Sequence, residues 1–285
     1  MKNHRTKLEY TFKSDILFRM LFINYQILLK RLVSVLLSIN IDDITEFIVI
    51  NADIPPEEIG KKFCRLDINM EVNGKKINLE LQNRDEGNYP ERTMYYWSRI
   101  YSSSLPSGSD YTKLPQTIII SIIDFNMFDC KEVHSQFKLM EINRYEPLSD
   151  KQIYHFFELQ KLEDIETLDL TNEKNLWLAL FNAETEEELE KLVSIGGEIM
   201  NQAVQAYHNI TATEEFRTIE WTRRKTEHDA AQAMTNAINN AEKRRDEHWQ
   251  SVVADKDAIL ADKEMKLKKQ ADLIAELEKK LGIKI

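Results

Sequence analysis

The chain has 285 residues, of which 42% are hydrophobic and 30% charged, so it has enough apolar material for one sizeable domain or two smaller ones. Seven glycines and six prolines argue against an all-β or loop-rich protein, and two cysteines without paired spacing argue against a disulfide scaffold or a zinc site. The net charge of −10 is concentrated in residues 131–210, which argues against tight non-specific binding of nucleic acid by that part, whereas residues 1–130 are nearly neutral.

The first ten residues are polar, and the longest apolar runs are too short to span a bilayer. We therefore expect a cytoplasmic protein without a membrane segment. Helical spacing of apolar residues predicts helices over residues 12–22 and 27–39. A strand is expected over residues 44–50, before a break at Pro55 and Pro56.

A β-hairpin is predicted from Arg65 to Gln82. Its turn is Asn73-Gly74, because both central residues of a type I′ turn need positive φ and this pair adopts it readily. Apolar and polar residues alternate on both sides of the turn. One face of the hairpin collects the apolar residues Leu66, Ile68, Met70, Val72, Ile77, Leu79 and Leu81.

The predicted register places two acidic residues opposite each other. With the turn centred on Asn73-Gly74, Glu71 faces Lys76, which is a favourable pair, but Asp67 faces Glu80. At a separation of about 5 Å and an effective dielectric constant of ~20, two such charges repel by roughly 3 kcal/mol. The pairing suggests that a cation lies between them.

Six further elements are expected after the hairpin, and together they indicate a mixed sheet flanked by helices. They are a helix over 90–104, strands over 116–125, 134–144 and 152–162, and helices over 175–181 and 184–194, after which Gly196-Gly197 acts as a break. A last helix, free of Gly and Pro, is expected from Thr213 to Leu281.

Within that last helix, apolar residues recur every seven positions, at Val253, Leu260, Leu267, Ile274 and Leu281. Only one of the companion core positions is apolar, so this is half of a coiled-coil seam. Two interpretations remain open, a coiled coil and a helix that is solvated or packed against its own chain. We expect self-association through residues 250–281, which would give a homodimer or a higher oligomer.

The polar face of the hairpin has the chemistry of a magnesium site. Glu80 and Gln82 project from the same face of one strand, Asp67 lies opposite, and the Leu81 carbonyl is a further oxygen. Magnesium prefers such hard oxygen ligands together with waters and phosphates, and it can activate a water for phosphodiester hydrolysis. The alternative is a half-exposed hairpin whose polar face meets water.

An aspartate on one hairpin strand, Glu-x-Gln on the next and a following helix of the form R-x-x-x-Y resemble the PD-(D/E)xK nuclease superfamily. The pattern is most similar to its Rpn branch, the recombination-promoting nucleases described as PD-(D/E)xK nuclease family transposases. The segments that carry the resemblance, over roughly residues 10–130, are FKSDILFRMLF, RLDINMEVNGKKINLELQ, ERTMYYWSRIYSSSL and YTKLPQTIIISIIDFNMF.

The resemblance implies roles for individual residues. Asp67 and Glu80 would bind Mg²⁺ or Mn²⁺, with Asp15 of the first helix as a further metal ligand; for Asp15 a surface or capping role is the alternative. Gln82 stands where the wider superfamily has a catalytic lysine and the Rpn branch commonly has glutamine. A neutral amide can orient water but cannot offset negative charge.

Three basic residues are candidates for the missing cation, namely Lys62, Lys76 and Arg84, and the sequence does not select among them. Arg92, Tyr96 and Arg99 form one stripe of the helix that follows the hairpin. In a nuclease this stripe would contact DNA phosphates or the acids, and the alternative is two surface charges beside a core tyrosine.

The function expected from the resemblance is a Mg²⁺-dependent DNA endonuclease of the transposase type, linked to recombination or mobile elements. A catalytically degenerate nuclease fold that binds DNA or drives oligomerisation is the alternative. The fold expected is an α/β restriction-endonuclease-like core with a helical, partly coiled-coil C-terminal extension. The expected domains are a nuclease-like domain over 1–165, a helical region over 166–212 and the long helix over 213–285.

Overall fold

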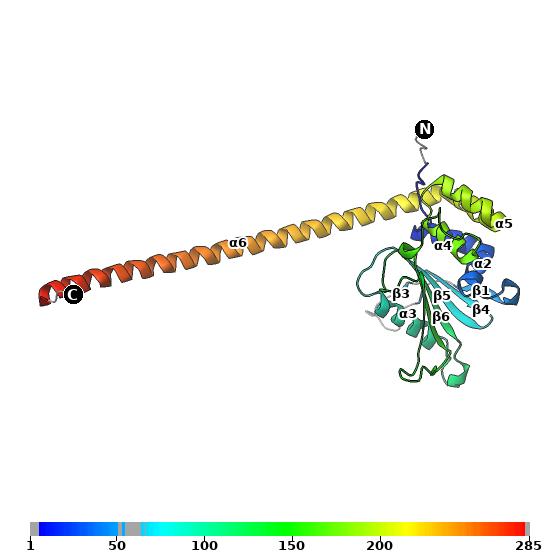
Figure 1. Cartoon of the computed structure of the whole chain (residues 1–285), viewed down its shortest axis with the longest axis horizontal. Helices are drawn as coiled ribbons and strands as arrows, with labels where there is room; N and C mark the ends of the chain where they lie inside the picture. Colours follow the sequence, from blue (N-terminus) through cyan, green and yellow to red (C-terminus); the bar gives the residue numbers. More distant parts are fainter. Residues whose placement is uncertain (1–5, 51–52, 55–63, 66, 283–285) are drawn as a thin grey trace. The chain divides into compact units, whose positions relative to one another are not determined.

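The computed structural model of the chain describes residues 6–50, 53–54, 64–65 and 67–282 (Figure 1). It divides into two compact units, Met1–Ile219 and Glu220–Ile285. The first unit holds a mixed sheet with helices on both faces, which confirms the expected α/β fold. The domain boundaries expected after residues 165 and 212 stay a prediction.

The main sheet has six strands in the order β1-β4-β5-β6-β8-β7. They are β1 (Phe47–Ile50), β4 (Ile68–Val72), β5 (Lys75–Gln82), β6 (Thr117–Ile123), β7 (His134–Lys138) and β8 (Gln152–Glu158). Strands β5, β6 and β8 run parallel to one another, while β1, β4 and β7 pair antiparallel with their neighbours. Strand β5, which carries Glu80, therefore lies in the interior of the sheet. A separate pair of short strands is formed by β2 (Asp53–Ile54) and β3 (Cys64–Arg65).

Helices cover both faces of the sheet, so its central strands are buried on both sides (Figure 1). Strand β6 shows this directly, because Ile118, Ile120 and Ile122 enter one core while Ile119 and Ile123 enter the other. The larger core includes residues of α1 (Asp15–Asn24), α2 (Gln26–Leu36), α4 (Glu173–Asn182) and α5 (Glu186–Thr211). The smaller core lies under α3 (Tyr89–Ser103).

Several predicted strands are shorter in the structure: β1 begins at Phe47 and not at residue 44, β6 covers Thr117–Ile123, and β8 ends at Glu158 and not at residue 162. Arg65 belongs to β3, so the first hairpin strand begins at Ile68, and Leu66 lies outside the described residues, as do Pro55 and Pro56. Strand β7 ends at Lys138 and not at residue 144, because a tight turn follows: the Glu141 carboxylate accepts hydrogen bonds from the backbone of residues 143 and 144.

The glycine pair interrupts the helix as predicted. Within α5, Gly197 has a φ of 59° and a ψ of −139°, which are not helical, so two helical segments meet there at a kink and the second continues to Thr211. Gly196 is needed for close packing, since a Cβ at this position would lie 2.6 Å from the Leu176 side chain of α4. The glycines thus allow a bend and a close approach between two helices within one element.

The second unit consists of residues from α6 (Glu214–Leu281), a single helix of 68 residues. Its heptad residues Val253, Leu260, Leu267 and Ile274 are each more than half exposed. Among the described residues, no helix combines the length and the apolar character needed to cross a bilayer.

Candidate active site

The hairpin turn has the geometry that the sequence predicts. Asn73 and Gly74 have φ values of 48° and 72°, and their strands pair in the expected register, with Glu71 opposite Lys76. The Asn73 side chain fixes the turn further, because its amide oxygen accepts the backbone N–H groups of Thr45 and Glu46 at 3.0 Å each. This anchoring leaves the opposite end of the hairpin in a defined register.

At that opposite end, Asp67 and Glu80 meet. The backbone N–H of Asp67 donates to Glu80 Oε1 at 3.1 Å, and the backbone N–H of Leu81 donates to Asp67 Oδ2 at 2.8 Å. The Asn78 side chain also donates to Glu80 Oε1, at 2.9 Å. Each carboxylate thus has one oxygen held by the hairpin. The other two oxygens, Asp67 Oδ1 and Glu80 Oε2, accept no hydrogen bond from the described residues.

The polar face of the hairpin is buried, so the alternative of a water-exposed face is wrong for its central residues. Asn78 is fully buried and Glu80 is 7% exposed. Burial, and then the nearby charge of Asp67, raise the pKa of Glu80 to about 8. Burial also raises the pKa of Asp67 to about 6. Two acids that share a buried site resist ionising together, and a cation between them would relieve this cost.

Charged groups from two helices act on the pair. Beside the dominant effect of burial, Asp15 raises the pKa of Asp67, whereas Arg19 and Arg92 lower it. Asp15 and Arg19 belong to α1 and Arg92 belongs to α3. Charges of the first helix and of α3 thus both influence the hairpin acids, and the roles that the resemblance implies for Asp15 and Arg92 stay a prediction.

Gln82, at the position of the superfamily's catalytic lysine, directs its side chain to the backbone two residues further along the chain. The side-chain N–H of Gln82 donates to the Arg84 carbonyl at 2.8 Å, which leaves the amide oxygen to accept a hydrogen bond. One of the three basic candidates is engaged, because Lys76 pairs with Glu71, whereas Arg84 is exposed to solvent. The third, Lys62, lies outside the described residues.

The stripe on α3 is half-buried along its length. Arg92 pairs with Glu86 at 3.2 Å, and its guanidinium carbon lies 4.8 Å from the centre of the Tyr89 ring. Tyr96 packs against the smaller core, as the alternative interpretation has it. Because the charge of Arg92 acts on both Asp67 and Glu80, this end of the stripe faces the acids. DNA contacts by Arg92, Tyr96 and Arg99 stay a prediction.

Two neighbours of the acids were not predicted from the sequence. Tyr89, 2% exposed, lies over the site at the start of α3, and burial followed by the charge of Glu80 raises the pKa of its hydroxyl. The second neighbour is Arg19. The sequence contained a signal for it, because Arg19 follows Asp15 by four residues and so lies on the same helix face.

The sequence that builds this site also matches a family model. A family model of the PD-(D/E)XK nuclease family transposases covers residues 12–237. The chain belongs to this family. No curated protein and no solved structure gives a significant match.

The matched region of this transposase family extends well beyond the segments in which the sequence shows the resemblance. It includes α4 and α5 and the first residues of α6. Membership supports a nuclease or transposase type of function with DNA as substrate, and PD-(D/E)XK nucleases generally use divalent metals.

The acid pair fits such a metal. Among the described residues, no group of three His, Cys, Asp or Glu side chains forms a metal-binding cluster, so Asp15 does not complete a three-ligand set. Asp67 Oδ1 and Glu80 Oε2 nevertheless offer two hard oxygen donors without a hydrogen-bond donor of their own. Magnesium typically takes one or two carboxylates and fills its remaining positions with waters and substrate phosphate.

Proposed function

We propose that the protein is a Mg²⁺- or Mn²⁺-dependent DNA endonuclease that hydrolyses phosphodiester bonds in recombination or at mobile elements. The observation that carries the proposal is the buried pair Asp67 and Glu80, because its two open carboxylate oxygens and raised pKa values are a site that a divalent cation would stabilise. Family membership supports the reaction type. The scarcity of cysteine supports the cytoplasm as the location.

In this proposal, Asp67 and Glu80 would hold the metal ion, and the Leu81 carbonyl and Asp15 would be further candidate ligands. A divalent ion held there would supply activation of a bound water and neutralisation of charge on the scissile phosphate. Gln82 orients the attacking water through its free amide oxygen. The water oxygen forms a bond to phosphorus and releases its proton to solvent, one phosphorus–oxygen bond to the sugar breaks, and the leaving oxygen takes a proton from solvent. Arg92, Tyr96 and Arg99 contact the DNA beside this centre.

The first prediction concerns the acid pair. Asp67→Asn and Glu80→Gln should each lower plasmid nicking in Mg²⁺ or Mn²⁺ by about 100-fold or more, because each removes a charged metal ligand. The measurement is the rate of conversion of supercoiled plasmid into nicked circles by the full chain.

Glu71→Gln is the matched control, since Glu71 lies on the same hairpin but pairs with Lys76 away from the acids. It should nick at the wild-type rate. Equal rates for wild type and Asp67→Asn would show that the cleavage centre lies elsewhere.

A second function, a degenerate nuclease fold that binds DNA or assembles without cutting, is favoured by one observation. Gln82 carries no charge, and its side chain is bound to the Arg84 carbonyl. This function would give DNA binding without nicking and without thermal stabilisation by Mn²⁺. Nicking that requires Glu80 would exclude it.

For α6 we propose self-association through residues 250–281. The exposed heptad residues Val253, Leu260, Leu267 and Ile274 support it, because a seam of large apolar side chains gains stability when a second helix covers it. The partner would be a second copy of the chain.

A further inference from the structure

Helix α1 has one face that packs in the larger core and another that carries charged residues. Leu17, Phe18 and Leu21 are buried in the larger core, which fixes the rotation of the helix about its axis. Asp15 and Arg19 lie four residues apart and so share another face. The position of Arg19 is therefore set by the packing of its neighbours.

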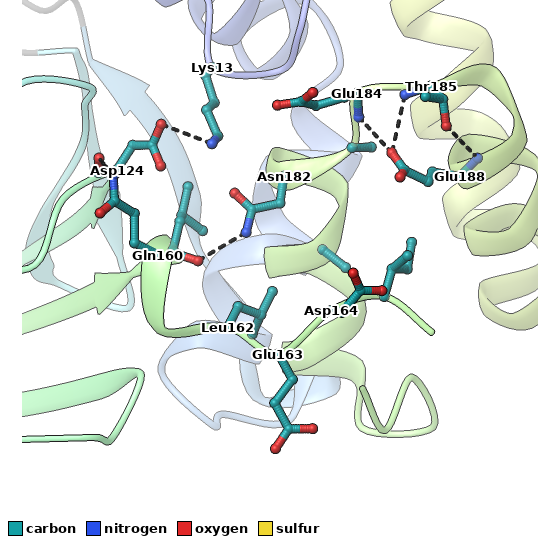
Figure 2. A pocket seen from close by; sticks show the side chains of 14 residues that line it. Lys13, Asp124, Gln160, Leu162, Glu163, Asp164, Asn182, Glu184, Thr185 and Glu188 are labelled. Atoms are coloured by element: carbon teal, nitrogen blue, oxygen red, sulfur yellow. Dashed lines mark hydrogen bonds and ion pairs between the residues drawn. The ribbon is translucent and has the colours of Figure 1, made fainter. Parts of the chain in front are cut away.

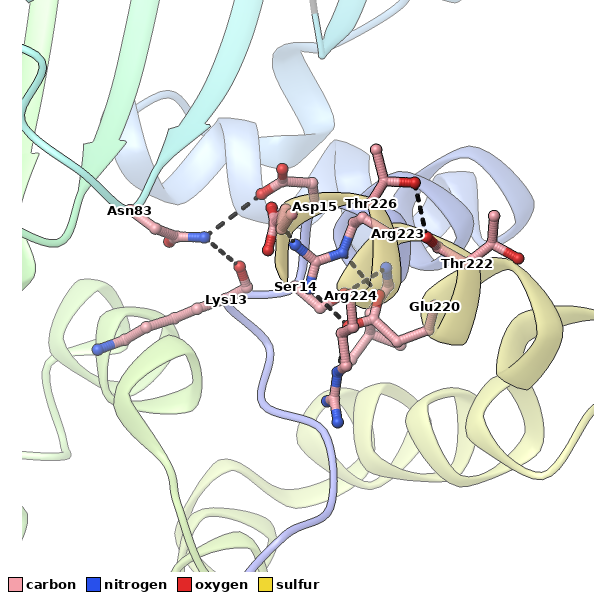
Figure 3. Close-up of polar contacts among 11 residues, drawn as sticks. Lys13, Ser14, Asp15, Asn83, Glu220, Thr222, Arg223, Arg224 and Thr226 are labelled. Atoms are coloured by element: carbon pink, nitrogen blue, oxygen red, sulfur yellow. Dashed lines mark hydrogen bonds and ion pairs between the residues drawn. The ribbon is translucent and has the colours of Figure 1, made fainter. Parts of the chain in front are cut away.

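The first turn of α1 is tied to the end of β5. Asn83, the residue after β5, donates from its side chain to the Lys13 carbonyl at 2.5 Å and to Asp15 Oδ1 at 3.3 Å (Figure 3). Asn83 is only three residues from Glu80. This connection holds the Asp15 and Arg19 face of α1 beside the acid pair.

Arg19 is half-buried, and it makes no hydrogen bond or ion pair with the residues that the structure describes. Other basic groups nearby are engaged: Lys13 pairs with Asp124 at 2.8 Å, Lys76 with Glu71 and Arg92 with Glu86. Arg19 follows Asp15 by one helical turn on the face of α1 that Asn83 ties to the end of β5, and its charge lowers the pKa of Asp67. A half-buried guanidinium without its own carboxylate is available to an anionic ligand.

We propose that Arg19 binds the scissile phosphate and supplies, from the first helix, the positive charge that the neutral Gln82 cannot supply from the strand. This inference rests on the proposed nuclease function. A guanidinium suits the task because its fork of N–H donors matches two phosphate oxygens, and its charge stabilises the negative charge that develops during hydrolysis.

The test uses the full chain with Arg19→Gln and Arg19→Lys. Arg19→Gln should slow plasmid nicking by about 100-fold, and Arg19→Lys by about tenfold, because lysine keeps the charge and loses the fork. Binding of Mn²⁺ alone, measured by calorimetry, should be unchanged or tighter in Arg19→Gln, since a cation beside Asp67 has been removed. A merely structural role for Arg19 would weaken both nicking and metal binding.

A rescue variant separates these cases. Gln82→Lys added to Arg19→Gln should recover about tenfold of the lost rate, because it returns a cation to the strand. Arg144→Gln is the matched control, as Arg144 is an exposed arginine that pairs with Glu141 and Glu146 in the turn after β7. It should nick at the wild-type rate.

Wild-type nicking together with an unchanged rate in Arg19→Gln would overturn this inference and leave the proposed function intact. Weaker Mn²⁺ binding in Arg19→Gln, or no rescue by Gln82→Lys, would also overturn it. Failure of the wild-type chain to nick DNA in Mg²⁺ and Mn²⁺ would instead overturn the proposed function, and this inference with it.

Discussion

At the scale of single residues, the Asn73-Gly74 turn sets the register of the hairpin. It thereby determines that Asp67 and Glu80, which are far from the turn, lie next to each other. Because strand side chains alternate with a period of two, a turn fixed at one position sets every pair along the hairpin, and Asp67 and Glu80 follow from it. The sequence could not reveal that this pair is buried, since burial depends on α3 and on the far strands of the sheet. For Arg19 the sequence showed the helix face that it shares with Asp15, but not that this face lies towards Asp67, which is distant in sequence.

The raised pKa of Glu80 predicts how stability changes with pH. Its pKa is about 8 when folded, through burial first and then the charge of Asp67, against an ordinary value of 4.5. The folded state therefore holds this proton more tightly. The contribution of the Glu80 proton to the free energy of unfolding is fully present below pH 4.5 and is lost as the pH rises towards and through 8. Without metal, the melting temperature should fall over this range.

Thermal unfolding in EDTA at several pH values measures this effect. Glu80→Gln, which cannot ionise, should melt above wild type at pH 9 and should flatten the pH dependence between 4.5 and 8. Added Mn²⁺ should raise the wild-type melting temperature most at high pH, where the carboxylate is ionised. A wild-type profile that stays the same in Glu80→Gln would contradict the assignment.

At the scale of elements, the strands and helices that position the site were predictable where one pattern governs them. The run of isoleucines in β6 is typical of a strand that is buried on both faces. The proline in the first turn of α3 indicates the start of a helix. Two features were not predictable in this way: the end of β7, which the carboxylate turn at Glu141 decides, and the close approach of α4 to Gly196 within α5. Both depend on tertiary contacts.

One lysine and several acids line a separate cavity in the first unit. A cavity of about 490 Å³ is lined by Lys13 and Asp124 on one side and by Glu163, Asp164 and Glu188 among others (Figure 2). Its acidic lining disfavours phosphate. The ion pair between Lys13 and Asp124 makes Lys13 part of this cavity's wall, so Lys13 is not the free cation of the acid pair.

The hairpin turn gives a prediction at this scale. Gly74 has a φ of 72° with open space around it, so Gly74→Ala adds strain without a clash. The cost should be about 1 kcal/mol, since an L-residue is disfavoured in the left-handed region, and it should lower the melting temperature by about 3 °C. Lys75→Ala, next to the turn, is the control and should melt close to wild type. A Gly74→Ala melting temperature equal to wild type would mean that the turn does not constrain the hairpin.

At the scale of the whole molecule, the family core and the heptad seam occupy different parts of the chain. The matched family region ends at residue 237, whereas the heptad residues run from Val253 to Ile274. The heptad residues thus lie outside the region that the family model matches. A stretch of helix with large exposed apolar residues at a constant spacing of seven is typical of an interface between helices.

This seam gives a prediction for the assembly of the chain. The double variant Leu260→Lys and Leu267→Lys should reduce the molar mass measured by light scattering to that of one chain, 33.6 kDa, because two charges would be buried in the interface. Met265→Lys is the matched control: Met265 is 61% exposed on the same helix but lies off the heptad stripe, so this variant should keep the wild-type mass. Deletion of residues 250–281 should act as the double variant does. A wild-type mass that is already that of one chain, or that neither change reduces, would assign the exposed heptad to a solvated helix.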